Sequence, residues 1–152
     1  MDERGGQEFD TEDIQRDINE YLQQIRPPPE EVLKMEYVFE ALAHPRRRYL
    51  IYSLLSSTEW TLRELATKLV AWERDLNEET VTDVDRDEMF ASLHHAHIPK
   101  LVDHGVIEYH NGEEGIIVAA ENAVQVLAAL EGLGASVDTD QEAHARSAYS
   151  GE

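Results

Sequence analysis

Three stretches of this chain decide its fold: ALAHPRRRYLIYSLL at residues 41–55, TLRELATKLVAW at residues 61–72, and HIPKLVDHGVIEYHNGEEGIIV at residues 97–118. In the first, Pro45 suits the opening turn of a helix that we expect over residues 45–56. In the second, Thr61 and Glu64 form a capping-box pattern, and apolar residues follow at helical spacing. In the third, a helix closes at Gly105, and two short alternating segments flank the turn sequence NGEEG. These stretches predict helices followed by a β-hairpin.

The rest of the chain predicts further helices on both sides of this region. A helix over residues 10–25 ends at the proline run 27–29, and the next is expected over residues 30–42 with its apolar side chains inward. Residues 73–84 predict a polar loop, and residues 85–104 a helix that Asp85 caps and Pro99 kinks. A last helix is expected over residues 121–133. The five side chains expected inward over residues 30–42 are Val32, Met35, Val38, Phe39 and Leu42.

This order predicts a mainly α fold with a small β-hairpin wing, which is a winged helix-turn-helix with extra N-terminal and C-terminal helices. We expect three segments. Residues 1–29 form an acidic extension with an amphipathic helix, residues 30–134 form the winged helix-turn-helix domain, and residues 135–152 form a flexible acidic tail. Residues 1–8 are likewise expected to be disordered.

Composition excludes several classes of protein. The 152 residues contain no cysteine, which excludes disulfides, thiolate metal sites and a cysteine nucleophile. No apolar run approaches the roughly 18 residues that a membrane span needs, and the acidic N-terminus does not resemble a signal peptide. The sequence shows no glycine-rich phosphate loop and no nucleophile motif. We therefore expect a cytoplasmic protein that is not an enzyme and needs no cofactor.

The charge balance is unusual, because 32 acidic residues face 13 basic ones and the formal net charge is -19. A solvated acidic surface with few lysines is typical of adaptation to high salt. The alternative is an acidic surface that mimics nucleic acid or binds a basic partner. At 1 M salt the Debye length is about 3 Å, so such a surface barely repels a phosphate beyond contact. The charge therefore does not exclude DNA binding in a salt-rich cytoplasm.

The segment ALAHPRRRYLIYSLL resembles the opening of ArsR-type winged-helix regulators. ELATKLVAWE at residues 64–73 and SLHHAHIPKLVDHGVIEYHNGE at residues 92–113 resemble, more specifically, a haloarchaeal winged-helix domain family of unknown function. The resemblance covers roughly residues 37–130. It implies the winged-helix architecture, and only by analogy does it imply a role in transcription regulation.

The helix over residues 85–104 is the candidate recognition helix, because such a helix presents its first turns to base edges. The arginines at 46–48 form the one basic cluster and match phosphate geometry, although they could equally pair with surface acids. Asp85, Asp87 and Glu88 crowd the start of the recognition helix and oppose phosphate contact. The candidate DNA-binding residues are Arg86, Ser92, His94, His95, Lys100, Arg46, Arg47 and Arg48.

Five histidines invite a metal hypothesis, because ArsR-type relatives include metal sensors. His94 and His97 lie one helical turn apart, but no metal-binding motif accompanies them, so we predict packed or solvated imidazoles and no metal site. The wing tip carries Glu113 and Glu114 and no basic residue, so we do not expect it to insert into a DNA groove. The remaining histidines of this group are His95, His104 and His110.

The terminal helices are candidate dimerisation surfaces, since terminal helices often pack against their symmetry mates in winged-helix dimers. The leading hypothesis is a homodimeric regulator that binds double-stranded DNA in high salt. The alternative to a regulator is a winged-helix protein-interaction module that does not bind DNA. The alternative to dimerisation through the first helix is that this helix folds back on its own domain. The candidate dimerisation residues are Ile14, Ile18, Tyr21, Leu22, Ile25, Val124, Leu127 and Leu130.

Overall fold

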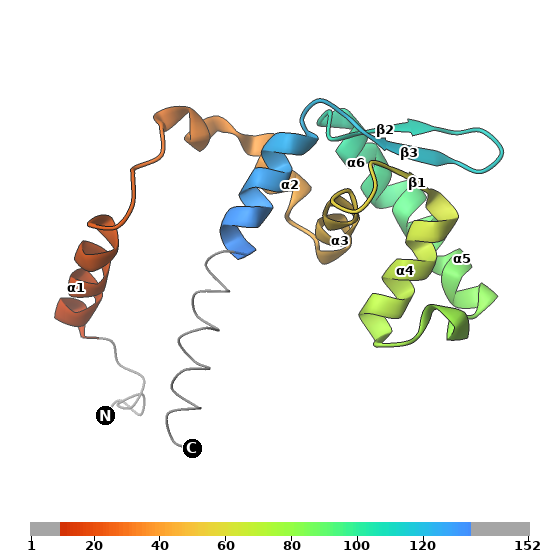
Figure 1. Cartoon of the computed structure of the whole chain (residues 1–152), viewed down its shortest axis with the longest axis horizontal. Helices are drawn as coiled ribbons and strands as arrows, with labels where there is room; N and C mark the ends of the chain where they lie inside the picture. Colours follow the sequence, from red (N-terminus) through yellow and green to blue (C-terminus); the bar gives the residue numbers. More distant parts are fainter. Residues whose placement is uncertain (1–9, 135–152) are drawn as a thin grey trace, which may run out of the picture. The chain divides into compact units, whose positions relative to one another are not determined.

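The computed structural model describes residues 10–134, which fall into two units divided between Met35 and Glu36. The predictions of disorder for residues 1–8 and 135–152 concern residues outside this range. In the first unit, helix α1 spans Thr11–Leu22 (Figure 1), and Asp10 caps it by accepting a hydrogen bond from the Glu12 amide at 2.9 Å. A short 3-10 helix, η2, spans Glu30–Lys34. No residue of α1 is buried.

The second unit has the order of a winged helix-turn-helix, as predicted. Two helices precede a short strand, the α4–α5 helix pair follows, and a β-hairpin closes the motif. After the hairpin, residues 123–134 are helical. The elements are α2 (Glu36–Ala41), α3 (Pro45–Ser53), β1 (Glu59–Thr61), α4 (Leu62–Arg74), η3 (Glu78–Thr80), α5 (Asp83–Ser92), η4 (Leu93–His97), α6 (Ile98–Asp103), β2 (Ile107–His110) and β3 (Ile116–Ala119).

The sheet has three antiparallel strands in the order β1-β3-β2, whereas the sequence predicted a hairpin alone. Trp60 in β1 and Tyr109 in β2 both stand opposite Ile117 in the central strand. The β1 strand was missed because three residues are too few to show alternation. Its last residue, Thr61, also caps α4 through the predicted capping box with Glu64, so the strand leads directly into the helix.

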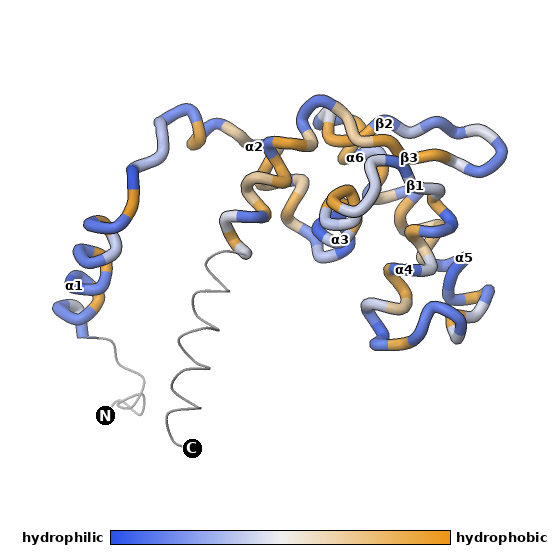
Figure 2. Tube along the Cα trace, in the orientation of Figure 1, coloured by the Kyte–Doolittle hydropathy of each residue, from blue (hydrophilic) through white to orange (hydrophobic). Residues whose placement is uncertain are grey.

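The core lies where α3, α4 and the α5–α6 region meet the sheet. Figure 2 shows apolar residues recurring along these elements between polar ones, as expected for helices with one buried face. The most completely buried large side chains are Leu50, Ile51, Leu62, Leu65, Leu69, Leu93, Leu101, Ile107 and Ile117. This arrangement holds α4, α5 and the hairpin on one framework.

The predicted continuous helix over residues 30–42 is wrong. Met35, at φ -83° and ψ 62°, interrupts it between η2 and α2. The five apolar residues predicted to face inward therefore do not belong to one continuous helix. Of those five only Val38 is buried, and Phe39 is 61% exposed.

Several helix boundaries differ from the prediction. Helix α1 ends at Leu22, so the predicted stripe residue Ile25 lies outside it. Helix α3 ends at Ser53, and its last turn tightens through Leu55 N–H donating to the Tyr52 carbonyl, which leaves Leu55 66% exposed instead of buried. Helix α5 begins at Asp83 and is capped by Thr82, whose side chain accepts from the Asp85 amide at 3.1 Å. Asp85 is therefore inside the helix and does not cap it.

Pro99 interrupts the long helix as predicted, and the form of the interruption is a π-helical segment. The Ile98 amide reaches back to the Leu93 carbonyl, which makes one widened turn in η4. A proline has no N–H and its ring crowds the carbonyl four residues earlier, so the turn ahead of it widens. Gly105 then closes α6 at φ +71°, the left-handed conformation that the sequence predicted.

Among the described residues, no helix combines the length and the apolar character required to cross a bilayer. In the helix over residues 123–134, Ala123 and Val126 are buried, whereas Val124 is 75% exposed. Val124 therefore lies on the outer side of this helix, and Val126 anchors it to the core.

Candidate nucleic-acid interface

The exposed face of α5 occupies the place of a recognition helix, and it is acidic. The helix follows α4 and the connection over residues 75–82, and it packs against α4. Asp83, Val84, Asp87 and Glu88 are exposed in its first two turns. Carboxylates can accept hydrogen bonds from cytosine amino groups, but they repel the negatively charged phosphates of the DNA backbone. Further along the chain, His95 in η4 is an exposed group able to hydrogen-bond a base or a phosphate.

Two predicted DNA-binding residues are turned away from this exposed face. Arg86 is 15% exposed because its Nε donates to Thr67 Oγ1 at 2.8 Å and its Nη1 pairs with Asp83 at 2.6 Å. His94 packs beneath the hairpin, with its ring centroid 6.3 Å from Phe90 and 5.8 Å from Tyr109. Both side chains therefore help to hold α5 in place.

Arg46 joins three elements, because it binds Glu73 of α4 and Ser92 of α5. Its Nε and Nη2 donate to the Glu73 carboxylate at 2.6 and 3.0 Å, and its Nη1 donates to Ser92 Oγ at 2.7 Å. The hydrogen bond with Glu73 raises the pKa of Arg46. The pairing of Arg46 with Glu73 is the alternative role that the sequence left open for this arginine, and the candidate Ser92 is bound to the same side chain.

The other predicted cations also have internal partners. Arg47 donates twice to the Glu40 carbonyl, at 3.1 and 2.9 Å, and Arg48 donates to the Leu42 carbonyl at 2.6 Å. Lys100 Nζ lies 3.8 Å from a carboxylate oxygen of Glu40. A phosphate contact by Arg47 or Arg48 would require these bonds to be exchanged.

The histidines lie in different surroundings. His97 is 5% exposed, its ring centroid is 4.4 Å from that of His44, and its Nδ1 is 3.1 Å from Arg47 Nη1. His104 contacts Glu40 at 2.6 Å, and His110 lies on β2 beside Glu108. Within residues 10–134, no cluster of three or more histidine and acidic side chains could hold a metal ion.

Burial lowers the pKa of His97 from 6.5 to about 4, and the nearby His44 and Arg47 add to the effect. Unfolded His97 takes up a proton near pH 6.5, whereas folded His97 does not. This histidine therefore contributes stability above pH 6.5 that is lost as the pH falls from 6.5 towards 4. We expect His97→Asn, which retains an acceptor for Arg47, to lose less stability over this window in urea titrations. An identical pH dependence in both proteins would contradict the assignment.

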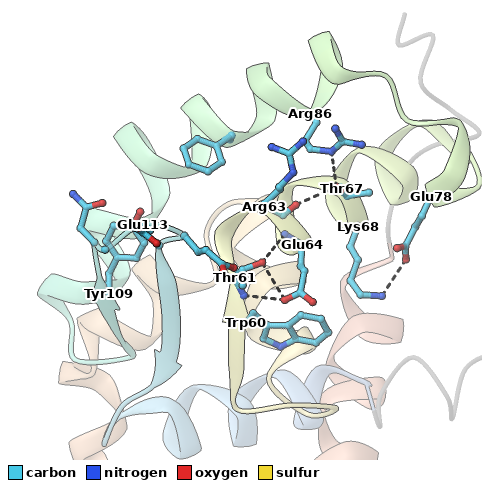
Figure 3. A pocket seen from close by; sticks show the side chains of 15 residues that line it. Trp60, Thr61, Arg63, Glu64, Thr67, Lys68, Glu78, Arg86, Tyr109 and Glu113 are labelled. Atoms are coloured by element: carbon cyan, nitrogen blue, oxygen red, sulfur yellow. Dashed lines mark hydrogen bonds and ion pairs between the residues drawn. The ribbon is translucent and has the colours of Figure 1, made fainter.

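A groove opens between α4, α5 and the β2–β3 turn (Figure 3), with a volume of about 850 Å³. Arg63, Lys68 and Arg86 reach it from the two helices. Lys68 pairs with Glu78 at 3.0 Å and lies 5.5 Å from the Trp60 ring centroid. The groove is lined by Trp60, Thr61, Arg63, Glu64, Thr67, Lys68, Glu78, Arg86, Phe90, Tyr109 and residues 111–115.

Arg63 and Lys68 were not among the residues that the sequence singled out. They are isolated cations on either side of the apolar stripe of α4, and no basic run draws attention to them. The usable signal is their position, because Arg63 occupies the first turn after the Thr61 cap. Only the folded chain brings them to the same groove as Arg86.

The β2–β3 turn contributes acid to the groove, through the exposed Glu113 and Glu114. Gly115 ends the turn at φ +67°, and a Cβ there would lie 2.6 Å from the Tyr109 hydroxyl. Glycine is therefore required by both the backbone conformation and the close approach of Tyr109. The turn is held against the wall of the groove.

Comparison with known proteins places residues 39–117 in a family described as "Domain of unknown function (DUF7344)". A solved structure described as an ArsR family transcriptional regulator is similar over 78% of this chain and 97% of its own, at 24% identity and a TM-score of 0.38. No curated protein matches the chain.

Proposed function

We propose that this chain, which belongs to the family described as "Domain of unknown function (DUF7344)", is a DNA-binding transcription regulator. The observation that carries the proposal is the α4–α5 pair followed by an antiparallel hairpin, with the first turns of α5 exposed. In helix-turn-helix proteins the second helix of such a pair enters the major groove and the first crosses the backbone. Within this proposal, His95 contacts DNA directly, and Lys100 is a second candidate for contact with the DNA.

The proposal includes a salt-rich cytoplasm as the working environment. The net charge of -19 and the acidic face of α5 would repel DNA in dilute buffer. In molar salt the Debye length falls to about 3 Å, and the repulsion is confined to contact distance. Cations trapped between Asp87 or Glu88 and a phosphate would then form part of the complex.

A homodimer is the proposed functional form. Four apolar side chains of α1 are 44–60% exposed, and Val124 is 75% exposed on the final described helix. Two copies that cover these surfaces would present two α5 helices to half-sites related by two-fold symmetry. Sedimentation in about 1 M salt, where surface charge is screened, tests this part, and a monomer at all concentrations would reject it. The four side chains of α1 are Ile14, Ile18, Tyr21 and Leu22.

A protein-interaction module is the second candidate, and the acidic face of α5 favours it. Asp83, Asp87 and Glu88 are exposed together, and the turn adds Glu113 and Glu114. Such a surface is complementary to a basic protein partner. The proposal of a regulator and this alternative make opposite predictions about what co-purifies with the chain.

The experiment is selection of genomic DNA fragments by the full chain at about 1 M salt, where repulsion is screened. Wild type is compared with His95→Ala, and with His110→Ala as a control on the hairpin. We expect sequence-selective enrichment that His95→Ala weakens by about tenfold and His110→Ala leaves unchanged, because one base contact is worth roughly 1–3 kcal/mol. Absence of selective enrichment at every salt concentration rejects the regulator. A stable protein partner free of nucleic acid supports the second candidate.

A further inference from the structure

We infer that the groove between α4, α5 and the β2–β3 turn binds a phosphate group between the guanidinium groups of Arg63 and Arg86. The two arginines belong to different helices, and in Figure 3 their side chains extend towards one another within the groove. Two cations side by side repel unless an anion lies between them. A guanidinium fork matches the geometry of phosphate oxygens.

Arg86 is held in position for this role. Thr67 Oγ1 accepts from Arg86 Nε at 2.8 Å and donates to the Arg63 carbonyl at 3.1 Å, so one hydroxyl joins the two helices. Asp83 binds Nη1 of Arg86 at 2.6 Å. Nη2 of Arg86 has no hydrogen-bond partner within residues 10–134, which leaves it available to a ligand in the groove.

Arg63 is the more accessible half of the site. It is exposed on the first turn of α4, and its guanidinium makes no hydrogen bond or ion pair with any residue from 10 to 134. Each of the other cations of the groove and of the basic cluster has a carboxylate or carbonyl partner, as Lys68 does with Glu78. Arg63 therefore loses no internal contact when it turns to a phosphate.

Four carboxylates line the same groove, and only two of them have a hydrogen-bond or ion-pair partner among the described residues. Glu64 accepts from the Thr61 amide and hydroxyl in the capping box, and Glu78 pairs with Lys68. Glu113 and Glu114 on the turn have no such partner among the described residues. Glu113 and Glu114 repel a phosphate unless salt screens their charge. Neutralising them should therefore strengthen phosphate binding in dilute buffer more than in molar salt.

The phosphate has two possible sources that share this chemistry. One is the backbone of a DNA strand, in which case the inference rests on the proposed function. The other is a small phosphorylated molecule, since about 850 Å³ lies within the usual range of ligand sites and Trp60 and Tyr109 supply aromatic surface. The site itself is tested with inorganic phosphate, independently of DNA.

The experiment records NMR spectra of the full chain, including arginine Nε–H signals, during titration with inorganic phosphate at about 1 M potassium chloride, where surface charge is screened. We expect saturable shifts at Arg63, Arg86 and Gly115. Arg63→Gln should weaken binding by about tenfold or more, because one charge-assisted pair is lost. Arg74→Gln is the control, since Arg74 is 55% exposed on the same helix and pairs with Asp85 outside the groove. In a parallel titration at about 0.05 M salt, the double change Glu113→Gln with Glu114→Gln should tighten phosphate binding more than it does at about 1 M, where surface charge is screened.

Duplex DNA supplies the second arm. If the source is DNA, phosphate competes with the duplex and Arg63→Gln weakens both ligands by a similar factor. If the source is a small molecule, Arg63→Gln weakens phosphate but leaves DNA affinity unchanged. Phosphate binding without any DNA binding retains the site and removes the proposed function. The inference is overturned if phosphate shifts no groove signal, or if Arg63→Gln binds phosphate as Arg74→Gln does.

Discussion

Leu65→Ala is expected to lower the free energy of unfolding by about 2–5 kcal/mol, the cost of removing a fully buried leucine and leaving a cavity. Leu65 has no exposed surface, and it lies on α4 between Leu62 and Leu69, which are equally buried. Helix α4 packs against α3, α5 and β1, so a cavity there loosens three contacts at once. Urea denaturation in high salt measures the change, because guanidinium would itself screen the surface charge.

Leu55→Ala provides the matched control. The sequence placed Leu55 on the core side of its helix, but the tightened last turn of α3 leaves it 66% exposed. Its truncation should change stability by no more than about 0.5 kcal/mol, as for most surface substitutions. Equal losses in the two variants would show that Leu55 is buried in solution, against the fold described above.

Affinity for a selected DNA duplex is expected to stay level or to rise between about 0.05 and 0.2 M salt, an interval over which ordinary binders lose roughly 10³–10⁵. Ordinary binding releases cations from DNA, and salt opposes that release. In the proposed complex the exposed Asp87 and Glu88 would lie near the phosphates, so cations would have to be taken up between two negative surfaces. Fluorescence anisotropy with a labelled duplex, recorded over a series of potassium chloride concentrations, gives the slope.

Neutralising the exposed face of α5 should restore the ordinary behaviour. We expect Asp87→Asn with Glu88→Gln to bind more tightly in dilute buffer and to weaken as salt increases. Glu121→Gln with Glu131→Gln removes the same charge from exposed positions outside α5 and should leave the slope nearly as in wild type. A steep loss of wild-type affinity from the lowest salt upwards would contradict the cation-uptake account.

The parts of the fold that the sequence predicted correctly have strong local determinants. Thr61 and Glu64 form the predicted capping box, Gly105 adopts the predicted left-handed conformation, and β3 spans the predicted residues Ile116–Ala119. Each depends on residues within a few positions of one another. Such signals survive folding because tertiary contacts do not have to supply them.

The errors arise where tertiary structure decides. Met35 interrupts a segment whose apolar spacing is helical, and Thr82 caps α5 although the Asp85–Glu88 pair carries a similar pattern. The spacing of apolar residues identifies the buried face of a helix, but it does not show where the helix begins or is interrupted. The β1 strand is stabilised by its pairing with β3, which lies more than fifty residues away in sequence and cannot be seen locally.

The sequence predicted which helix forms the candidate site, but it did not predict which side chains of that helix are available to a ligand. The sequence identified the helix that contains α5, whereas the structure turns Arg86 into the groove and binds Arg46 to Glu73. An arginine's role depends on which acid or hydroxyl its long side chain reaches, and helical periodicity does not contain that information. Arg63 was overlooked for the same reason, because only its position beside Arg86 distinguishes it.

The widened turn of η4 determines which side chains of α5 are exposed to solvent. The segment contains one residue more than a regular turn, and each residue advances a helix by about 100°. Removing a single residue between Leu93 and His97 would therefore rotate all of α5 by roughly that angle relative to α6. Asp87 and Glu88 would leave their present orientation, and another set of side chains would take their place. Relatives that differ by one residue at this turn would consequently display different surfaces on the same framework.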